Sequence, residues 1–169
     1  AGNSGEFYTP RAITAFMVDR INPRLDRRET VLDPACGTGG FLTAAIDHLR
    51  SQLSTHSSAS DHSAIETLIH GIEKKQLPHL LCTTNMLLHG ISTADLHNDD
   101  TLAKPRHIKG GELQRFDRIL TNPPFSIPWG TADKDSKGQS VWAPDFRAER
   151  FSYGEVPLGA KKADLMFLQ

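Results

Sequence analysis

Hydrophobic residues follow two different periods along the chain. Short apolar runs are typical of buried strands, and apolar residues three and four positions apart are typical of helices. The runs predict strands at 30–33, 68–73, 93–97 and 116–121. The helical spacing predicts helices over 10–21, 41–50 and 76–88, the last with Leu77, Leu80, Leu81 and Leu88 on one side. Strands that alternate with helices predict a mostly parallel α/β sheet.

The first helix has recognisable ends, and two long stretches have no helical or strand pattern. Thr9 and Pro10 have the form of an N-cap followed by proline at the first helical position, and Asn22-Pro23 ends the helix. The stretch 51–63 is polar and rich in serine, which predicts a loop. No periodic pattern survives from 123 to about 157, which predicts a working loop or disorder.

Length, charge and hydropathy narrow the class of protein. The 169 residues suit one compact domain. A net charge of -1 is too low for a domain that grips duplex DNA unaided, because phosphate binding requires a basic excess. No apolar window approaches the roughly 18 residues of a membrane span, so we expect no membrane contact and a cytoplasmic location. The chain lacks an initiator methionine and ends on an apolar run, so we expect a truncated domain.

The two cysteines and eight histidines lack the spacing of a metal site. Cys36 and Cys82 are too few for a disulfide scaffold. The histidines are scattered, and none lies in a recognisable zinc motif. We therefore expect histidines that are packed or solvated, and no metal site.

A glycine-rich turn at 33–41 joins the first predicted strand to the following helix. Glycine lets the backbone approach a ligand closely, and the start of a helix offers free N–H donors. The dinucleotide-binding fingerprint requires a third glycine two residues after Gly40, where this chain has Leu42. A pyrophosphate cradle is therefore the weaker interpretation of this turn.

Two further positions follow predicted strands. Glu73 ends the second strand, where an acid hydrogen-bonds ribose hydroxyls in nucleoside-binding α/β folds, although a solvated surface glutamate is the ordinary alternative. The tetrapeptide at 122–125, Asn-Pro-Pro-Phe, directly follows the fourth strand. Open α/β sheets place their ligand crevice at that end, and a turn is again the alternative.

In combination these motifs resemble those of the N6-adenine DNA methyltransferases, and most closely the modification subunit of type I restriction-modification systems. The segment 5–10 is similar to the family's N-terminal cofactor motif, 33–41 to its glycine-rich motif and 122–125 to its catalytic tetrapeptide. The segments 71–73, 85–90 and 162–164 also resemble that subunit. The resemblance implies a Rossmann-like S-adenosylmethionine-dependent methyltransferase core over 1–169, without the later strands of the sheet and the flanking domains.

The resemblance also implies roles for individual residues. The cofactor S-adenosyl-L-methionine would be held by Glu6, Phe7, Tyr8, Thr9, Pro10, Arg11, Asp33, Gly37, Thr38, Gly39, Gly40, Glu73 and Asp100, with Asp99 as the alternative to Asp100. The catalytic residues Asn122, Pro123, Pro124 and Phe125 would receive a flipped-out adenine. The expected partners are DNA and the specificity and restriction subunits of a type I complex, and the specificity subunit would select the DNA target.

Two other functions are compatible with the same motifs. One is a methyltransferase of this fold that acts on RNA or on a protein amide, and the other is a non-catalytic fragment for cofactor binding or assembly. The loop 126–160 also has two interpretations, as a DNA-contacting segment or as a lid packed on the domain. Its candidates for DNA contact are Trp129, Trp142, Arg147, Arg150 and Tyr153.

Overall fold

The computed structural model describes residues 8–131, 134, 136–139 and 142–169. The chain divides into two compact units, which are described separately. We call Thr9–Thr101 with Arg106–Asn122 the sheet unit, and Leu102–Pro105 with Tyr8 and the described residues from Pro123 onward the loop unit. How much of the chain forms one domain stays a prediction.

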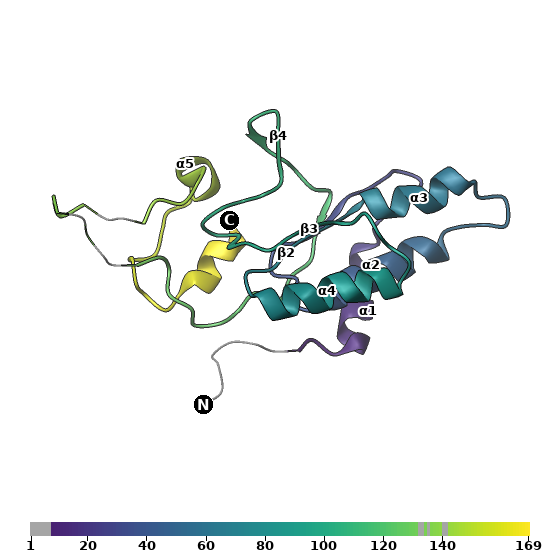
Figure 1. Ribbon diagram of the computed structural model, residues 1–169, viewed down its shortest axis with the longest axis horizontal. Coiled ribbons are helices and arrows are strands. Elements are labelled where there is room, and N and C mark those ends of the chain that lie inside the picture. Colours follow the sequence, from purple (N-terminus) through teal and green to yellow (C-terminus); the bar gives the residue numbers. More distant parts are fainter. Residues whose placement is uncertain (1–7, 132–133, 135, 140–141) are drawn as a thin grey trace. The chain divides into compact units, whose positions relative to one another are not determined.

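The sheet unit contains all the strands and the four longest α-helices of the described residues (Figure 1). In chain order its elements are α1 (Arg11–Ile21), β1 (Val31–Asp33), α2 (Gly40–Ser51), α3 (Ala59–Thr67), β2 (Ile69–Ile72), α4 (Gln76–Leu88), β3 (Asp95–His97), β4 (Ile108–Lys109), β5 (Glu112–Leu113) and β6 (Arg118–Ile119). The loop unit contains α5 (Arg147–Arg150) and the 3-10 helix η1 (Ala163–Leu168).

Four of the strands form one parallel sheet in the order β3-β2-β1-β6. The chain crosses from β3 back to β6 on the far side of β1, so the order of the strands reverses beside β1. All four carboxyl ends therefore meet at one edge, next to the point where ligands bind in open α/β sheets. The predictions of four strands and of a mostly parallel α/β fold are confirmed.

The two faces of the sheet carry different residues because side chains alternate along each strand. Gly71 faces α2, and a Cβ atom at Gly71 would lie 2.9 Å from the side chains of both Leu42 and Leu96. Glycine at this position lets both leucine side chains pack closely against the backbone of β2. The principal core lies on this side and contains Val31, Phe41, Leu42, Ala45, Ile46, Leu49, Ile69, Cys82 and Met86 among others. The opposite face carries His70 of β2, which pairs in register with Asp95 of β3.

The bounds of α4 agree with the predicted helix, but the predicted apolar side of that helix is exposed. Leu77, Leu80, Leu81 and Leu88 are all solvent-accessible, whereas Cys82 and Met86 are buried. A Cβ at Gly39 would lie 2.8 Å from Cys82 Sγ and 3.2 Å from Met86 Cε, so α4 packs against the glycine turn through these two residues. The buried side of α4 is therefore the side that packs against the backbone of the glycine turn, and not the side that carries the leucine stripe.

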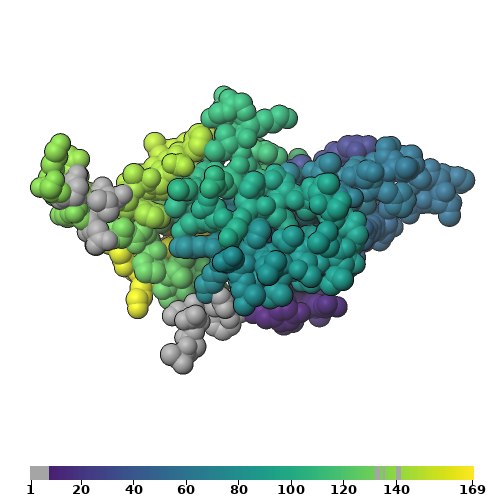
Figure 2. All heavy atoms as spheres, in the orientation of Figure 1, coloured from purple at the N-terminus to yellow at the C-terminus, as the bar shows by residue number. Residues whose placement is uncertain are grey.

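Two features lie outside the helices and strands that the sequence predicted. The helix α3 begins inside the polar stretch 51–63, and Ser58 and Asp61 form a capping box at its start. This reciprocal pair of bonds satisfies two backbone donors and explains why a polar sequence begins a helix there. The second is a hairpin of β4 and β5, which turns at Gly110 and Gly111 with positive φ. The hairpin projects from the surface of the sheet unit (Figure 2).

The short strand β6 is held beside β1 by side chains at its start. Asp117 Oδ2 accepts hydrogen bonds from the backbone N–H and the hydroxyl of Thr30, at 2.8 and 2.9 Å. Arg118 forms an ion pair with Glu29 at 3.0 Å and donates to the carbonyl of Ile21 at the end of α1. These bonds fix the strand that leads into Asn122.

The loop unit has a small apolar core of its own, so the residues that form this core are packed, where the sequence predicted a working loop or disorder. Its buried residues are Leu102, Trp129, Phe151, Ala163 and Met166. The indole N–H of Trp129 donates to Glu155, which also accepts two bonds from Arg147. Trp129 is therefore a packed residue and offers no stacking surface to DNA. Tyr153 is almost fully exposed.

Across the described residues, every helix is too short or too polar to cross a lipid bilayer.

Candidate functional site

The glycine turn links the carboxyl end of β1 to the start of α2 through backbone bonds to the neighbouring strand. The N–H of Cys36 donates to the Ile72 carbonyl at 3.0 Å, and the N–H of Gly39 donates to the Cys36 carbonyl at 2.7 Å. Asn85 of α4 donates to the carbonyl of Thr38 at 2.8 Å. The Asn85 side chain was not predicted as a site residue, although the segment 85–90 belongs to the resemblance. The turn is thus held by β2 on one side and α4 on the other.

Gly37 and Gly39 both have positive φ, at 53° and 87°, but their surroundings differ. A Cβ at Gly39 would collide with Cys82 Sγ at 2.8 Å and crowd Met86 Cε at 3.2 Å. A Cβ at Gly37 would meet no atom within 4 Å. Gly39 is therefore required by internal packing, whereas Gly37 borders open space at the carboxyl edge of the sheet.

This difference predicts unequal losses of stability. Alanine in the left-handed region costs about 1–2 kcal/mol at either position. Gly39→Ala is expected to lose a further amount of about 1–3 kcal/mol from overpacking against Cys82. Urea unfolding of the two variants measures the difference, and Cys82→Ala in the Gly39→Ala background should recover part of it. Equal losses at the two glycines would contradict the assignment of Gly39 to packing.

Asp33 is the buried acid of the turn. Its side chain is almost entirely inaccessible, and its Oδ1 accepts the N–H of Ala35 at 3.1 Å. Burial raises the pKa of Asp33 to about 7, because the charged form loses its hydration, and the bond from Ala35 offsets only part of that effect. A buried carboxyl group that ionises near neutral pH is well suited to a cationic partner.

Glu73 directly follows β2, and its side chain contacts the glycine turn. Its Oε2 accepts the N–H of Gly37 at 2.9 Å, and its Oε1 accepts the N–H of Lys75 at 2.7 Å. The structure thus brings Glu73 directly against the glycine turn. Each carboxylate oxygen can accept a second bond, so the side chain can hold the turn and still accept bonds from ligand hydroxyls.

The two aspartates after β3 differ in their partners. Asp99 forms an ion pair with Arg106 and accepts the N–H of Asp100. Asp100 lies 2.8 Å from the ammonium group of Lys74. The N–H of Asp99 donates to the Glu73 carbonyl at 3.1 Å, so this segment runs beside the end of β2. The choice of Asp100 over Asp99 as a cofactor ligand stays a prediction.

Asn122 lies at the carboxyl end of β6, and its side chain is held by a residue far away in sequence. The amide nitrogen of Asn122 donates to Thr9 Oγ1 at 3.1 Å. Thr9 was predicted as the N-cap of α1, but Pro10 is the N-cap and no side chain caps that helix. The carbonyl of Pro10 begins the helix by accepting the N–H groups of Ile13 and Thr14. The Thr9 hydroxyl is therefore available to Asn122.

Not all of the remaining predicted site residues lie at the carboxyl edge of the sheet. Glu6 and Phe7 lie outside the described residues. Tyr8, Pro123, Pro124 and Phe125 belong to the loop unit, in which Phe125 and Tyr8 are exposed. Pro10 and Arg11 are exposed at the start of α1. Within the sheet unit, the residues brought to one edge are Asp33, Gly37, Thr38, Gly39, Gly40, Glu73, Asp99, Asp100, Asn122 and Thr9.

A second polar cluster lies on the other face of the sheet. His70, His97 and His107 are scattered along the sequence, but all three approach Asp95. Burial lowers the pKa of His107 to about 4, because Asp95 only partly offsets the loss of hydration. The cluster joins β2 and β3 to the segment that precedes the β4–β5 hairpin.

The parallel sheet, its strand order and the glycine turn define a Rossmann-like α/β domain of the methyltransferase class. A solved type I restriction-modification system methyltransferase subunit from Streptococcus thermophilus is similar to 99% of this chain, with a TM-score of 0.67 and 30% sequence identity. The matched part is 32% of that protein. The fold and its mostly parallel sheet are therefore those of known methyltransferases.

The chain belongs to the N-6 DNA methylase family, whose model matches residues 1–169. It is 54% identical over 126 residues to the type I restriction enzyme EcoEI methylase subunit of Escherichia coli, covering 74% of this chain and 24% of that protein. It is 35% identical over 129 residues to the type II restriction enzyme and methyltransferase RM.BcgI of Heyndrickxia coagulans, covering 74% and 19%. The chain spans less than a third of the length of these two relatives.

Proposed function

We propose that this chain is the cofactor-binding and catalytic core of a type I modification subunit, which methylates the N6 amine of adenine in DNA with S-adenosylmethionine. The observation that carries the proposal is the meeting of Asp33, Glu73 and Asn122 at the carboxyl edge of one parallel sheet. The strands that lead to them are β1, β2 and β6, and the glycine turn lies between the first two. Similarity to the EcoEI methylase subunit supports the type I assignment.

The residues of the turn fit S-adenosylmethionine. The open space beside Gly37 permits close approach of a ligand to the backbone, and no side chain caps the start of α2. The cofactor supplies an electrophilic methyl group on a positively charged sulfonium. Ionised Asp33 favours this positive charge, Glu73 accepts bonds from the ribose hydroxyls, and Asp100 accepts from the adenine. In the proposal, residues 6–11 cover the methionine part.

Asn122 and Pro123 would act on the target amine. The lone pair of an exocyclic adenine amine is delocalised into the ring, which makes the amine a poor nucleophile. The side-chain oxygen of Asn122 and the carbonyl of Pro123 would accept hydrogen bonds from its two N–H groups and so localise the lone pair on nitrogen. As the methyl group leaves the sulfonium for this nitrogen, the amine would lose one proton to solvent. The advantage is preorganisation, because both acceptors are set before the reaction begins. A dedicated general base is not needed for this step.

Thr9 is a positioning residue in this proposal, because it holds the amide nitrogen of Asn122 and so orients the oxygen. Thr9→Val removes the acceptor and is expected to lower kcat by about tenfold, since a small misplacement at the reacting atoms is costly. Thr9→Ser keeps the hydroxyl and should retain most of the rate. Steady-state kinetics of the whole protein with both variants measures this. A Thr9→Val effect confined to KM, or equal losses in both variants, would contradict a positioning role.

Phe125 would stack on the flipped adenine. Extrusion of a base from the duplex costs about a few kcal/mol. Stacking on an aromatic ring returns roughly 1–3 kcal/mol, which is comparable with that cost. The side chain of Phe125 is half exposed in the loop unit, so its ring presents surface to solvent. In the proposal, Pro124 stiffens the backbone between Phe125 and the two acceptors.

DNA binding would depend on partner subunits. The net charge of -1 gives this chain too little positive charge to neutralise many phosphates. We therefore assign target recognition to a specificity subunit, and cleavage to a restriction subunit, of a type I complex. Arg147 is already paired with Glu155 and Trp129 is buried, so neither side chain is offered to DNA.

A comparison of methyl acceptors tests the proposed function. The whole protein with its specificity subunit is incubated with labelled S-adenosylmethionine and with DNA, RNA or protein from the same cells. Label in DNA, recovered as N6-methyladenine, is the expected result. Label confined to RNA or protein would assign the same active site to the alternative substrates, because fold does not determine substrate. Cofactor binding without any transfer would favour a non-catalytic fragment.

A further inference from the structure

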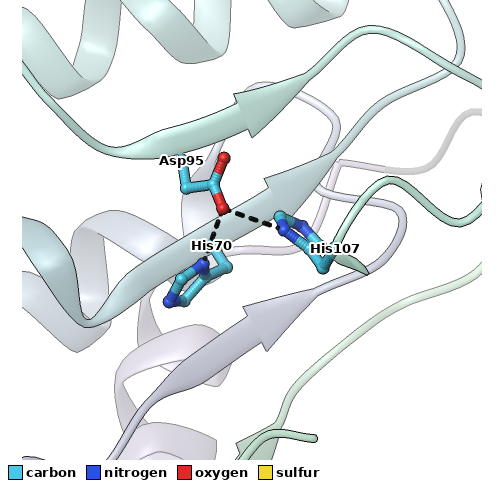
Figure 3. Close-up of side chains that lie close together, drawn as sticks. All are labelled: His70, Asp95 and His107. Carbon is cyan, nitrogen blue, oxygen red and sulfur yellow. Dashed lines mark hydrogen bonds and ion pairs between the residues drawn. The ribbon is translucent and has the colours of Figure 1, made fainter. Parts of the chain in front are cut away.

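The cluster of histidines on the far face of the sheet lies outside the proposed active site. His70 of β2 and His107 direct their rings to the same oxygen of Asp95 (Figure 3). The Nδ1 atom of His70 lies 3.2 Å from Asp95 Oδ2, and that of His107 lies 3.0 Å from it. The Nε2 atom of His97 lies 2.8 Å from Asp95 Oδ1. Three imidazole rings from three segments thus converge on one carboxylate.

The register of two strands creates this arrangement. His70 pairs with Asp95 across β2 and β3, and His97 is two residues after Asp95 and therefore on the same face. His107 comes from the segment before β4 and packs edge-on against the ring of His70, with 5.3 Å between the ring centroids. Phe116 covers the same two rings at 4.9 and 5.3 Å. The cluster is built from parts of the chain that are far apart in sequence.

We propose that His70, Asp95 and His107 form a zinc site that fastens the β4–β5 hairpin to the sheet, with His97 holding the second oxygen of Asp95 and a water molecule as the fourth ligand. One ligand atom from each of the first three residues lies within 4.8 Å of the others. Zinc bonds of about 2.0–2.1 Å place neighbouring ligand atoms of a tetrahedron about 3.3 Å apart. The distances from the Asp95 oxygen to the two imidazole nitrogens already match that edge.

The exposure of the four side chains suits a site with one entrance. The side chains of His70 and His107 are only 8% and 4% exposed, whereas those of Asp95 and His97 are 45% and 35% exposed. A cation can therefore enter past Asp95 and reach the two buried rings. The Nδ1 atoms of His70 and His107 face Asp95 and would bind the ion, whereas the Nε2 atoms of both rings are buried without a hydrogen-bond partner.

The site would also stabilise the edge of the cofactor site. The carbonyl of His97 accepts the N–H of Glu73 at 2.9 Å, and Glu73 holds the glycine turn. A metal ion bound to Asp95, whose second oxygen contacts His97, would therefore fix the end of β3 next to Glu73. This role would be structural, because none of the proposed ligands belongs to the proposed active site. In the proposed mechanism, Asn122 and the glycine turn need no metal.

Zinc titration of the metal-stripped whole protein tests the proposal, with a chromophoric chelator as competitor. The expected result is one tightly bound zinc ion per chain, and an intense visible absorption when tetrahedral Co²⁺ replaces it. Asp95→Asn should weaken this binding at least about tenfold, the loss typical of impaired metal-site contacts. The matched control His62→Gln removes an exposed histidine of α3 and should leave zinc binding unchanged.

Asp95 is partly exposed, so Asp95→Asn is expected to fold, and circular dichroism checks this. Hydrogen exchange supplies a second readout, in which zinc slows exchange in the segment 106–113 of the wild type and not of Asp95→Asn. Absence of stoichiometric zinc binding by the wild type would overturn the proposal. Equal binding by the wild type and Asp95→Asn would overturn it as well, and would leave a hydrogen-bonded histidine cluster. None of these measurements depends on methyl transfer.

Discussion

Asn122→Ala is expected to abolish methyl transfer and to leave the affinity for S-adenosylmethionine nearly unchanged. The variant removes the side-chain oxygen that is proposed to accept a hydrogen bond from the target amine, while the glycine turn, Asp33 and Glu73 are untouched. Loss of one preorganised hydrogen-bonding group in an active site typically lowers kcat by about 100-fold to 1000-fold. Single-turnover kinetics on DNA gives the rate of transfer, and calorimetry gives the cofactor affinity.

A double variant tests whether Thr9 acts on the substrate only through Asn122, as proposed. In the Asn122→Ala background, Thr9→Val should have little further effect on the rate, since the group that Thr9 positions is gone. A loss of cofactor binding equal to the loss of transfer would move Asn122 from the substrate side to the cofactor side. Additive losses in the double variant would give Thr9 a separate role.

Asp33→Asn is expected to stabilise the unliganded protein at neutral and alkaline pH, although it weakens cofactor binding. Burial raises the pKa of Asp33 to about 7, from an ordinary value of 3.8. Since each unit corresponds to about 1.4 kcal/mol, ionised Asp33 costs the fold roughly 4 kcal/mol above pH 7. Asparagine keeps an oxygen for the N–H of Ala35 and removes the buried charge.

The direction of the pH dependence follows from proton binding. Between pH 4 and pH 7 the folded state holds a proton on Asp33 that the unfolded chain has lost, so this group's contribution to stability falls as the pH rises. The advantage of Asp33→Asn should be absent near pH 4, increase up to pH 7 and then remain constant. Chemical denaturation of both proteins across this range measures it. An advantage that does not change with pH would mean that the pKa of Asp33 is the same in the folded and unfolded states, which would contradict the effect of burial.

Local signals in the sequence were sufficient for most of the secondary structure. The strand at Val31–Asp33 and the helix at Gln76–Leu88 follow from short-range apolar patterns and from the glycines beside them. The capping box of Ser58 and Asp61 was also readable from sequence, as a serine followed three residues later by an acid, but the surrounding serines masked it. Each of these features depends on residues close together in the chain.

Features that depend on long-range packing could not be read in this way. The leucines of α4 formed the clearest apolar stripe in the sequence. The helix instead buries Cys82 and Met86, which pack against Gly39 of the glycine turn. The bond between Thr9 and Asn122 joins residues 113 positions apart, so no spacing rule predicts it. Motif order could predict Asn122 as a site residue, but not the group that orients its side chain.

The histidine cluster shows the same limit. Zinc motifs are recognised from sequence when the ligands are closely spaced, but here the register of β2 and β3 brings His70 to Asp95. The spacing of His70, Asp95 and His107 along the chain contains no hint of this register. Asp33 stands at a strand end before a glycine turn, which was sufficient to predict it as a candidate site residue, and its role in cofactor binding stays a prediction.

The most direct test of the central claim is calorimetric titration of S-adenosylmethionine into the whole protein, beside Asp33→Asn. The claim is that the turn between Asp33 and Gly40 binds this cofactor through ionised Asp33. The predicted result is one saturable site that is weakened in the variant, with close to one proton released on binding at pH 6 and almost none at pH 8.5, because free Asp33 titrates near pH 7. Equal binding by the variant, or no binding by the folded wild type, would contradict it.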